Sequence, residues 1–218
     1  MSPSDEDPHL AFPTGFFDRA DPSDDARFYE PDRFVTHIDD RAIGAVAGLY
    51  QHLGLTGSVL DLCSSWISHF ADAPTELVAL GMNRHELAAN QMASSWVVHD
   101  LNTEPTLPFE DDRFDAATCC VSIDYLVRPI DVMREVARVV RPGGLFVCTF
   151  SNRCFPTKAI NGWLRTDDRG RVAIVSRYFE LSCMFEPAVA VLCTAPGPGD
   201  PLFGVWAAVR QASDHPHN

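Results

Sequence analysis

The sequence predicts an α/β fold, in which a mostly parallel seven-stranded sheet carries helices on both faces and ends in an antiparallel hairpin. Three observations predict it. Five short apolar runs alternate with helical or loop segments, and two further runs near the carboxyl end follow each other without a helix between them. Apolar side chains in several intervening segments recur at helical spacing.

The predicted elements follow one another in a regular order. The first helix is expected over residues 38–53, where the apolar pattern stops at Gly54, a common helix C-terminal cap. The strands of the parallel part are expected at residues 58–63, 77–82, 96–99, 114–121 and 145–150. Further helices are expected at residues 84–92 and 130–140 and, in an insertion, at 156–164 and 171–182. The hairpin is expected from residues 188–194 and 203–210, which the turn-forming sequence APGPGD joins.

The length bounds the number of domains. A chain of 218 residues, 46% of them hydrophobic, suffices for one sizeable core but not for two full domains. We expect an acidic, partly irregular arm at residues 1–35, one domain at residues 36–210 and a disordered tail at residues 211–218. The arm is rich in Pro, Asp and Ser but also carries aromatic residues, so two interpretations stay open: an irregular surface arm, or a lid that closes over substrate.

Charge and cysteine usage exclude several classes of protein. Residues 1–40 hold 11 acids against 3 bases, so they carry -8 of the formal charge of -13, and no basic stripe offers a platform for nucleic acid. No apolar run approaches the roughly 20 residues that a membrane helix needs, and no signal pattern begins the chain, so we expect a cytoplasmic protein. Seven cysteines without a CxxC pair indicate reduced thiols, rather than a disulfide scaffold or a metal site. A small molecule is therefore the expected partner, and the oligomeric state stays open.

The ends of the predicted strands define a candidate site. In open α/β sheets, ligands bind beyond the carboxyl ends of the strands, where the strand order reverses. Those ends are strongly polar in this chain, and they comprise residues 63–66, Asn83, and residues 100–102, 122–125 and 151–153.

A string of motifs carries a resemblance to a known family. Residues 107–115 read LPFEDDRFD, Tyr125 and Leu126 follow the fourth strand, and residues 134–145 read REVARVVRPGGL. We expect residues 142–144 to stop a helix and turn sharply into the fifth strand. The string resembles the corresponding segments of class I, Rossmann-like S-adenosylmethionine-dependent methyltransferases of the type 11 group. Over residues 36–210, this resemblance implies the strand order 3-2-1-4-5-7-6 and S-adenosylmethionine as cofactor.

The cofactor loop departs from that family. Residues 61–66 read DLCSSW in place of DLGCGxG, and glycine serves such a loop by allowing positive φ and close approach of the backbone to the ligand. The hydroxyls of Ser64 and Ser65 could replace backbone contacts. Asn83 stands where the family places an acid that accepts hydrogen bonds from both ribose hydroxyls, and an amide can accept one of them. Asp100 matches the position whose acid contacts the adenine amine.

Each candidate residue receives a role on this basis. The resemblance implies that the cofactor is bound by Asp61, Cys63, Ser64, Ser65, Trp66, Asn83, Asp100, Leu101, Asn102 and Ser122. Methyl transfer needs a base only for a nucleophile that starts protonated, and His69, Asp124 and Tyr125 are the catalytic candidates. His69 would lie one helical turn beyond the loop if a helix begins at Ser65, although a structural histidine is an equal alternative.

Asn152 and Arg153 are the candidates for substrate binding. Arg153 suits an anionic group on the substrate, or is a surface arginine. We therefore expect an S-adenosylmethionine-dependent enzyme that methylates an O, N or S nucleophile of a small molecule. The alternative is a non-catalytic binding or regulatory protein that keeps the fold. A dehydrogenase is disfavoured because no G-x-G-x-x-G turn follows the first strand.

Overall fold

A computed structural model describes residues 7–211, so the expected tail lies outside the described residues except for Gln211. Seven strands form one sheet in the order β3-β2-β1-β4-β5-β7-β6, which confirms the predicted order. The strands are β1 (Ser58–Leu62), β2 (Glu76–Gly81), β3 (Ser95–Val98), β4 (Phe114–Cys120), β5 (Val140–Phe150), β6 (Val189–Leu192) and β7 (Phe203–Ala208). The first five are parallel, and β7 pairs antiparallel with both β5 and β6.

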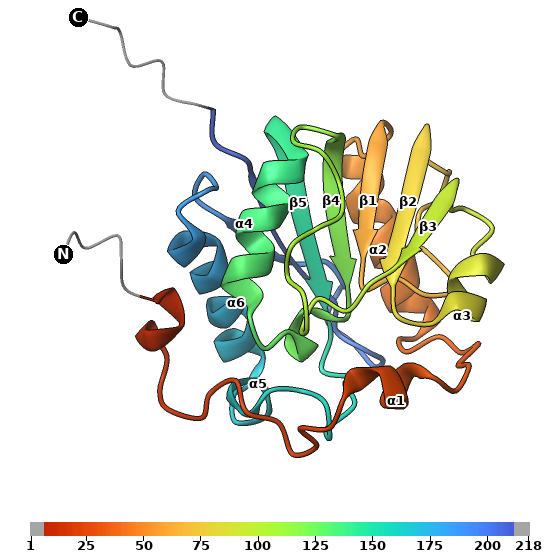
Figure 1. The fold of residues 1–218 in the computed structure, drawn as a ribbon. Coiled ribbons are helices and arrows are strands. Elements are labelled where there is room, and N and C mark those ends of the chain that lie inside the picture. Colours follow the sequence, from red (N-terminus) through yellow and green to blue (C-terminus); the bar gives the residue numbers. More distant parts are fainter. Residues whose placement is uncertain (1–6, 212–218) are drawn as a thin grey trace, which may run out of the picture.

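Helices cover both faces of the sheet (Figure 1). They are η1 (Pro8–Ala11), α1 (Asp25–Tyr29), α2 (Asp40–His52), α3 (Arg84–Ala89), η2 (Ile123–Tyr125), α4 (Pro129–Val139), α5 (Asn161–Leu164) and α6 (Asp168–Ser182). The larger hydrophobic core joins one face of the sheet to α4 and α6, and a smaller one joins the other face to α2. Proline at the first position of α4 suits a helix start, because the amide that proline lacks would have no partner there. Among the described residues, no helix is both long and apolar enough to cross a membrane.

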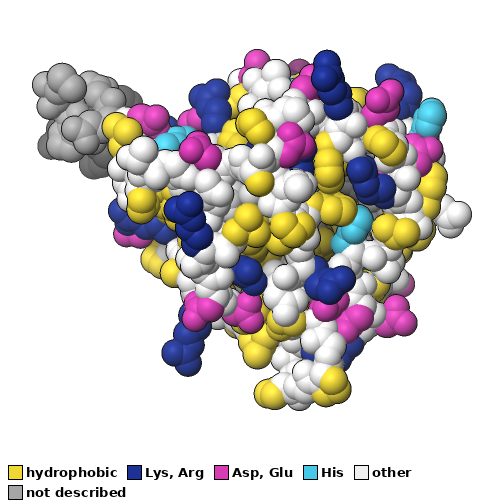
Figure 2. Space-filling model, turned by 90° about the horizontal axis from the view of Figure 1, so that it is seen from below, with side chains coloured by type: hydrophobic (Ala, Val, Ile, Leu, Met, Phe, Trp, Pro, Cys, Tyr) yellow, Lys and Arg dark blue, Asp and Glu magenta, His cyan; other side chains and the backbone are white. Residues whose placement is uncertain are grey.

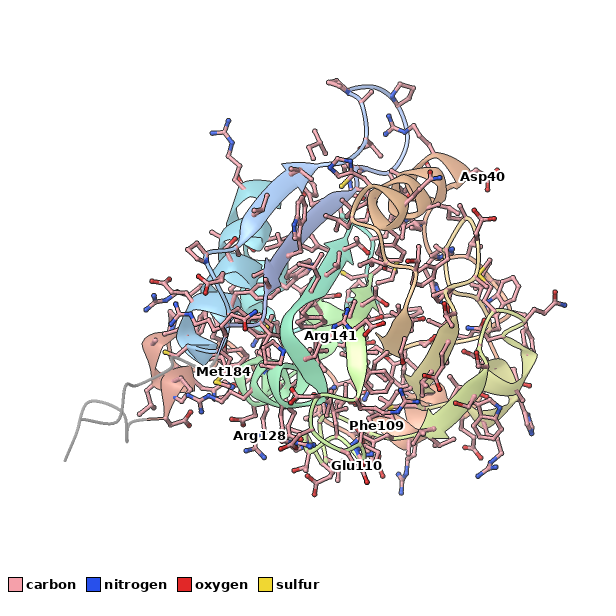
Figure 3. The ribbon with its side chains drawn as sticks, turned by 90° about the horizontal axis from the view of Figure 1, so that it is seen from above. Asp40, Phe109, Glu110, Arg128, Arg141 and Met184 are labelled. Carbon is pink, nitrogen blue, oxygen red and sulfur yellow. The ribbon has the colours of Figure 1, made fainter. Side chains whose placement is uncertain are left out.

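The prediction for residues 142–144 was wrong in one respect. Helix α4 ends at Val139, and β5 already begins at Val140, so the Pro-Gly-Gly segment lies inside the strand. The register with β4 shifts between Phe114 and Ala116, which accommodates the extra residues as a bulge. Gly143 has φ +82 and donates its N–H to the carbonyl of Val209, so the glycine serves the bulge and not a helix cap. Figure 3 shows this end of the sheet, with Arg141 labelled near the start of β5.

One helix prediction was also wrong, and the condition on which the placement of His69 depended is not met. Residues 63–75, all of them described, contain no helix, so His69 does not lie one helical turn beyond the loop. The physical reason is the Asp61 carboxylate, which accepts hydrogen bonds from the hydroxyls of Ser64 and Ser68 and holds this segment in an irregular path. In the insertion, only residues Asn161–Leu164 of the expected 156–164 are helical.

The N-terminal arm is fastened to the domain by buried charges. Asp25 accepts two hydrogen bonds from Arg19, at 2.7 and 2.8 Å, and one from the Asn102 amide at 2.8 Å. The ammonium group of Lys158, whose side chain is fully buried, lies 3.0 Å from both Asp25 and Asp21. From η1 the arm runs along the lower edge of the sheet in Figure 1 to α1. The arm is therefore packed against the strand ends.

Candidate functional site

A cavity of about 530 Å³ lies at the carboxyl ends of β1, β2, β4 and β5. The strand order reverses between β1 and β4, which is where open α/β sheets bind ligands. The volume is within the range of about 300–1,000 Å³ that is typical of small-molecule sites. The cavity therefore has the position and the size of a ligand site.

Most of the predicted site residues meet at this cavity. Its lining includes Asp61, Cys63, Ser64, Ser65, His69, Asn83, Asp100, Leu101, Asn102, Ser122, Tyr125, Asn152 and Arg153. Trp66 and Asp124 are not among the lining residues. The Trp66 indole instead donates to the carbonyl of Val35 and so ties the loop to the arm.

The arm and the two residues that follow it supply lining residues that the sequence analysis did not assign to the site. They are Asp25, Tyr29, Arg33 and Val35 of the arm, followed by Thr36 and His37. The aromatic residues of the arm were the available signal, since they had raised the possibility of a lid. Glu86, His99 and Tyr50 also line the cavity, and nothing in their local sequence pattern had marked them.

Asp61 at the end of β1 is buried and already has three hydrogen-bond donors. Its oxygens accept from the hydroxyls of Thr118 at 2.7 Å, Ser64 at 2.7 Å and Ser68 at 2.6 Å. The Ser64 hydroxyl is thus engaged in holding the loop and does not point free into the cavity. This carboxylate organises the floor of the site.

The turn after β1 has a residue with positive φ that is not a glycine. Cys63 has φ 52, a left-handed conformation that costs a residue with a side chain on the order of 1 kcal/mol. The neighbouring loop backbone packs against β2, where a Cβ at Gly81 would overlap the carbonyl oxygen of Ser64. Gly81 therefore provides the close approach that the loop itself cannot.

Asn83, at the end of β2, uses its whole amide group within the protein. Its Oδ1 accepts from the backbone N–H groups of His85 and Glu86 and caps α3. Its Nδ2 donates to the carbonyls of Tyr29 and Glu30 and to the Asp32 carboxylate. The side chain has no capacity left for a ligand.

In the segment after β3, some of the polar side chains already form hydrogen bonds within the protein. Asn102 donates to Asp25 and to the carbonyl of Tyr125, and it accepts from the N–H of Val127. Asp100 accepts from the backbone N–H of Asn102 and from the Thr103 hydroxyl, which leaves acceptor capacity on its carboxylate. Asp100 is therefore the member of this pair that can still meet a ligand.

His69 enters the cavity from the loop after β1. Its Nδ1 is buried and has no hydrogen-bond partner among the described residues. Burial lowers the pKa of His69, the negative charge of Asp61 opposes that shift, and His37 adds to it. The ring is therefore neutral at pH 7, as a proton acceptor must be.

Asp124 and Tyr125, adjacent in η2, lie in different surroundings. The Tyr125 hydroxyl lies at the cavity and accepts from the N–H of Phe155. Asp124 is 2% exposed, its Oδ2 has no partner among residues 7–211, and burial raises the pKa of its carboxyl to about 8. At pH 7 this carboxyl is a buried neutral acid behind the cavity wall.

The rim near β5 is open. Asn152 and Arg153 are exposed, and Arg153 forms no ion pair with any described residue. Aromatic side chains stand beside them, with the Phe155 ring 6.0 Å from Tyr125 and 5.1 Å from the His37 imidazole. Figure 2 shows this end of the molecule, where basic and acidic side chains are interspersed around hydrophobic ones.

Comparison with known proteins gives this geometry a context. Residues 52–148 match a family model described as a methyltransferase domain. The chain is 31% identical over 119 residues to a demethylmenaquinone methyltransferase of Clavibacter sepedonicus, an alignment that covers 53% of this chain and 47% of the relative. It is 35% identical over 77 residues to a mitochondrial 2-methoxy-6-polyprenyl-1,4-benzoquinol methylase of Danio rerio, covering 35% of this chain and 23% of the relative. The chain thus spans less than half the length of these curated relatives.

Solved structures share the fold. One is a putative methyltransferase in complex with the Trm112 methyltransferase activator of Haloferax volcanii, with a TM-score of 0.57, 12% identity, and coverage of 81% of this chain and 92% of that one. Another is a SAM-dependent methyltransferase of Aquifex aeolicus, with a TM-score of 0.54, 15% identity, and coverage of 78% and 94%.

The cavity fits the cofactor that this domain family indicates. The turn at Cys63 has a positive φ, Asp61 and Ser64 lie at the cavity floor, and Asp100 retains acceptor capacity. Asn83 does not fit this expectation. Its amide group is fully hydrogen-bonded within the protein, so it cannot accept the expected hydrogen bond from a ribose hydroxyl. The chain has a class I methyltransferase fold, and residues 52–148 match the methyltransferase domain model, which indicates S-adenosylmethionine as the cofactor.

Proposed function

We propose that this protein is an S-adenosylmethionine-dependent methyltransferase that acts on an O, N or S nucleophile of a small molecule. The observation that carries the proposal is the cavity at the switch point between β1 and β4, two strands that lie within the matched residues 52–148. S-adenosylmethionine, when bound, supplies an electrophilic methyl group. Asp100 and Leu101 would hold its adenine end, and residues 63–65 would face the remainder.

The residues around the open part of the cavity would handle the acceptor. His69 lines the cavity and is neutral at pH 7, so its imidazole would take a proton from a hydroxyl, amine or thiol that starts protonated. Tyr29 of the arm and His37 just after it line the cavity and would limit the access of water. Arg153 can pair with an anionic group on the acceptor.

The aromatic wall favours a planar acceptor. Tyr29, Tyr125 and Phe155 line the cavity, and such rings stack on aromatic ligands. Relatives whose names record methylation of a benzoquinol and of demethylmenaquinone agree with this choice. Phenols and hydroquinones therefore come first in a panel of acceptors.

Cofactor binding is the first test. Calorimetry with S-adenosylhomocysteine should show a dissociation constant in the range of about 1–100 μM, which corresponds to roughly 5–8 kcal/mol. Asp100→Ala should weaken binding about tenfold, since it removes a carboxylate acceptor. Thr103→Ala is the matched control, because it removes the Thr103 hydrogen bond to Asp100 but keeps the carboxylate. Absence of binding at millimolar ligand would defeat the proposal.

A second candidate function is a non-catalytic binding or regulatory protein. Two observations favour it. The side chains of Asp61 and Asn83 already form hydrogen bonds within the protein, and residues 63–75 contain no helix. Turnover separates the two. Release of S-adenosylhomocysteine with an acceptor from the panel, abolished by His69→Ala for protonated acceptors, supports the enzyme. Tight binding without turnover across broad metabolite extracts supports the binding protein.

A further inference from the structure

The end of β2 lacks a free side-chain acceptor at the position where the cofactor's ribose is expected. Asn83 occupies it, and its amide is consumed by two backbone N–H groups of α3 and three oxygen atoms of the arm. A diol brought to this place would find no acceptor on Asn83. The hydroxyls would lose their hydrogen bonds to water without replacement, which disfavours binding.

One helical turn further, Glu86 offers what Asn83 lacks. Its side chain is 7% exposed and lines the same cavity. Its Oε1 accepts from the backbone N–H of Arg33 at 2.7 Å, and its Oε2 accepts no hydrogen bond from any described residue. No ion pair with a described side chain neutralises it, although the charge of Arg33 lies near.

This arrangement is uncommon for a buried carboxylate. Burial raises the pKa of Glu86, the backbone N–H and the charge of Arg33 oppose that, and Asp32 adds to the rise. A carboxylate in such surroundings gains from any donor that enters the cavity, because a hydrogen bond to an ionised acceptor is stronger than one to a neutral acceptor.

The arm holds Glu86 in place. Arg33 belongs to the same arm segment whose backbone binds Asn83, and its guanidinium donates to the carbonyls of Phe28 and Pro31. The hydrogen bond from Arg33 therefore fixes Oε1 of Glu86, while Oε2 of this cavity-lining side chain accepts no hydrogen bond from a described residue. The arm and α3 together hold the Glu86 carboxylate in place, with Oε2 as its remaining acceptor.

Resting on the proposed function, we propose that Glu86 takes the place of the acid missing at Asn83 and binds the vicinal ribose hydroxyls of S-adenosylmethionine. Glu86 is then a binding residue for the nucleoside part of the cofactor, and it acts through Oε2. The presence of Asn83 in place of an acid therefore does not remove the ribose contact. The contact is made instead by Glu86, about one helical turn further along the chain.

Calorimetry with S-adenosylhomocysteine and its 2′-deoxy and 3′-deoxy analogues tests this on the full chain. We expect the wild type to bind at least one deoxy analogue tenfold or more weakly than the parent compound, as for a hydrogen bond to a charged group. Glu86→Gln keeps an oxygen for the N–H of Arg33 but removes the charge, so the discrimination should fall to about threefold or less. Asp32→Asn is the matched control, since Asp32 lies beside Asn83 but does not line the cavity, and it should keep the wild-type discrimination.

The outcomes separate this inference from the proposed function. If S-adenosylhomocysteine binds and Glu86→Gln discriminates as strongly as the wild type, the role of Glu86 is overturned while the function stands. If the wild type itself does not discriminate, Glu86 likewise has no contact with the diol. If S-adenosylhomocysteine does not bind at all, both fall. The thermal unfolding midpoint of each variant without ligand should match the wild type within a few degrees, which excludes misfolding as the cause.

Discussion

The two sides of the cavity differ in how many of their polar groups are still free. At the ends of β1 and β2, Asp61 and Asn83 are saturated by partners within the protein. At the ends of β4 and β5, Tyr125 keeps a free hydroxyl proton, and Asn152 and Arg153 are exposed on the rim. The first side is built to hold the shape of the site, and the second is open to a ligand.

This difference shows that a residue's position in a motif does not establish that its side chain is available. Asp61 and Asn83 stand at motif positions, yet their hydrogen bonds serve the loop, α3 and the arm. Glu86 stands at no motif position, yet one of its oxygens is free. A saturated residue should affect stability when it is replaced, and an open one should affect binding. The four variants below test this division.

The largest loss of stability is expected at the arm. Asp25→Ala removes the carboxylate that binds Arg19, Lys158 and Asn102, so the fully buried ammonium group of Lys158 keeps only the partly exposed Asp21 as a counter-charge. Breaking a buried pair by removing one partner costs about 3–5 kcal/mol. Urea unfolding measures the loss, and limited proteolysis should show cleavage within residues 19–33. Asp18→Ala, an exposed acid of the same arm, serves as control and should change stability by less than about 0.5 kcal/mol.

The next largest loss is expected at the saturated floor. Asp61→Ala leaves the hydroxyls of Ser64, Ser68 and Thr118 without their acceptor, and at roughly 1 kcal/mol each this costs about 3 kcal/mol. Urea unfolding again provides the measurement. Asp72→Ala removes the same charge from an exposed site in the same loop and should be nearly neutral. A loss below about 1 kcal/mol for Asp61→Ala would contradict the division between saturated and open sides.

Behind the open side, Asp124 should make stability depend on pH. Because burial raises the pKa of this carboxyl to about 8, the folded protein holds its proton across a range in which the unfolded chain has already released it. Stability from this group is complete below about pH 4 and is lost as pH rises toward 8, by up to about 1.4 kcal/mol per pH unit. Asp124→Asn should flatten that slope, as followed by urea unfolding between pH 5 and 8. An unchanged slope would show that Asp124 is ionised or paired, and Asp72→Asn, at an exposed site, is the control.

The smallest effect on stability is expected at the rim. Arg153→Ala should leave the free energy of unfolding unchanged within about 0.5 kcal/mol, because the side chain is exposed and unpaired among the described residues. It should raise KM for anionic acceptors about tenfold and leave neutral acceptors unaffected. Arg165→Ala, an exposed arginine outside the cavity, is the matched control. Equal effects on both classes of acceptor would argue against a pairing role for Arg153.

The strands of the sheet could be predicted from the sequence because each one is an apolar run that is recognisable from its own residues. The alternation of apolar runs and helical segments, with the resemblance, led to the observed strand order, and the strand ends brought most of the named residues to one cavity. What could not be predicted depends on contacts between distant segments. The amide of Asn83 reaches residues 29–32, and Glu86 binds the N–H of Arg33, 53 positions away. The absent helix after β1 likewise results from the hydroxyl contacts of Asp61.

Asn83 forms hydrogen bonds with both α3 and the arm, and this affects how these two segments unfold. One side chain caps α3 through its Oδ1 and donates to the carbonyls of Tyr29 and Glu30 through its Nδ2, so it links the two segments directly. Residues 29–33 and 84–89 should therefore behave as one cooperative unfolding unit in amide hydrogen exchange, although 50 residues of chain separate them. Opening of the cavity on the arm side would then be a single concerted event and not the swing of an independent flap, while the rim near β5 stays open.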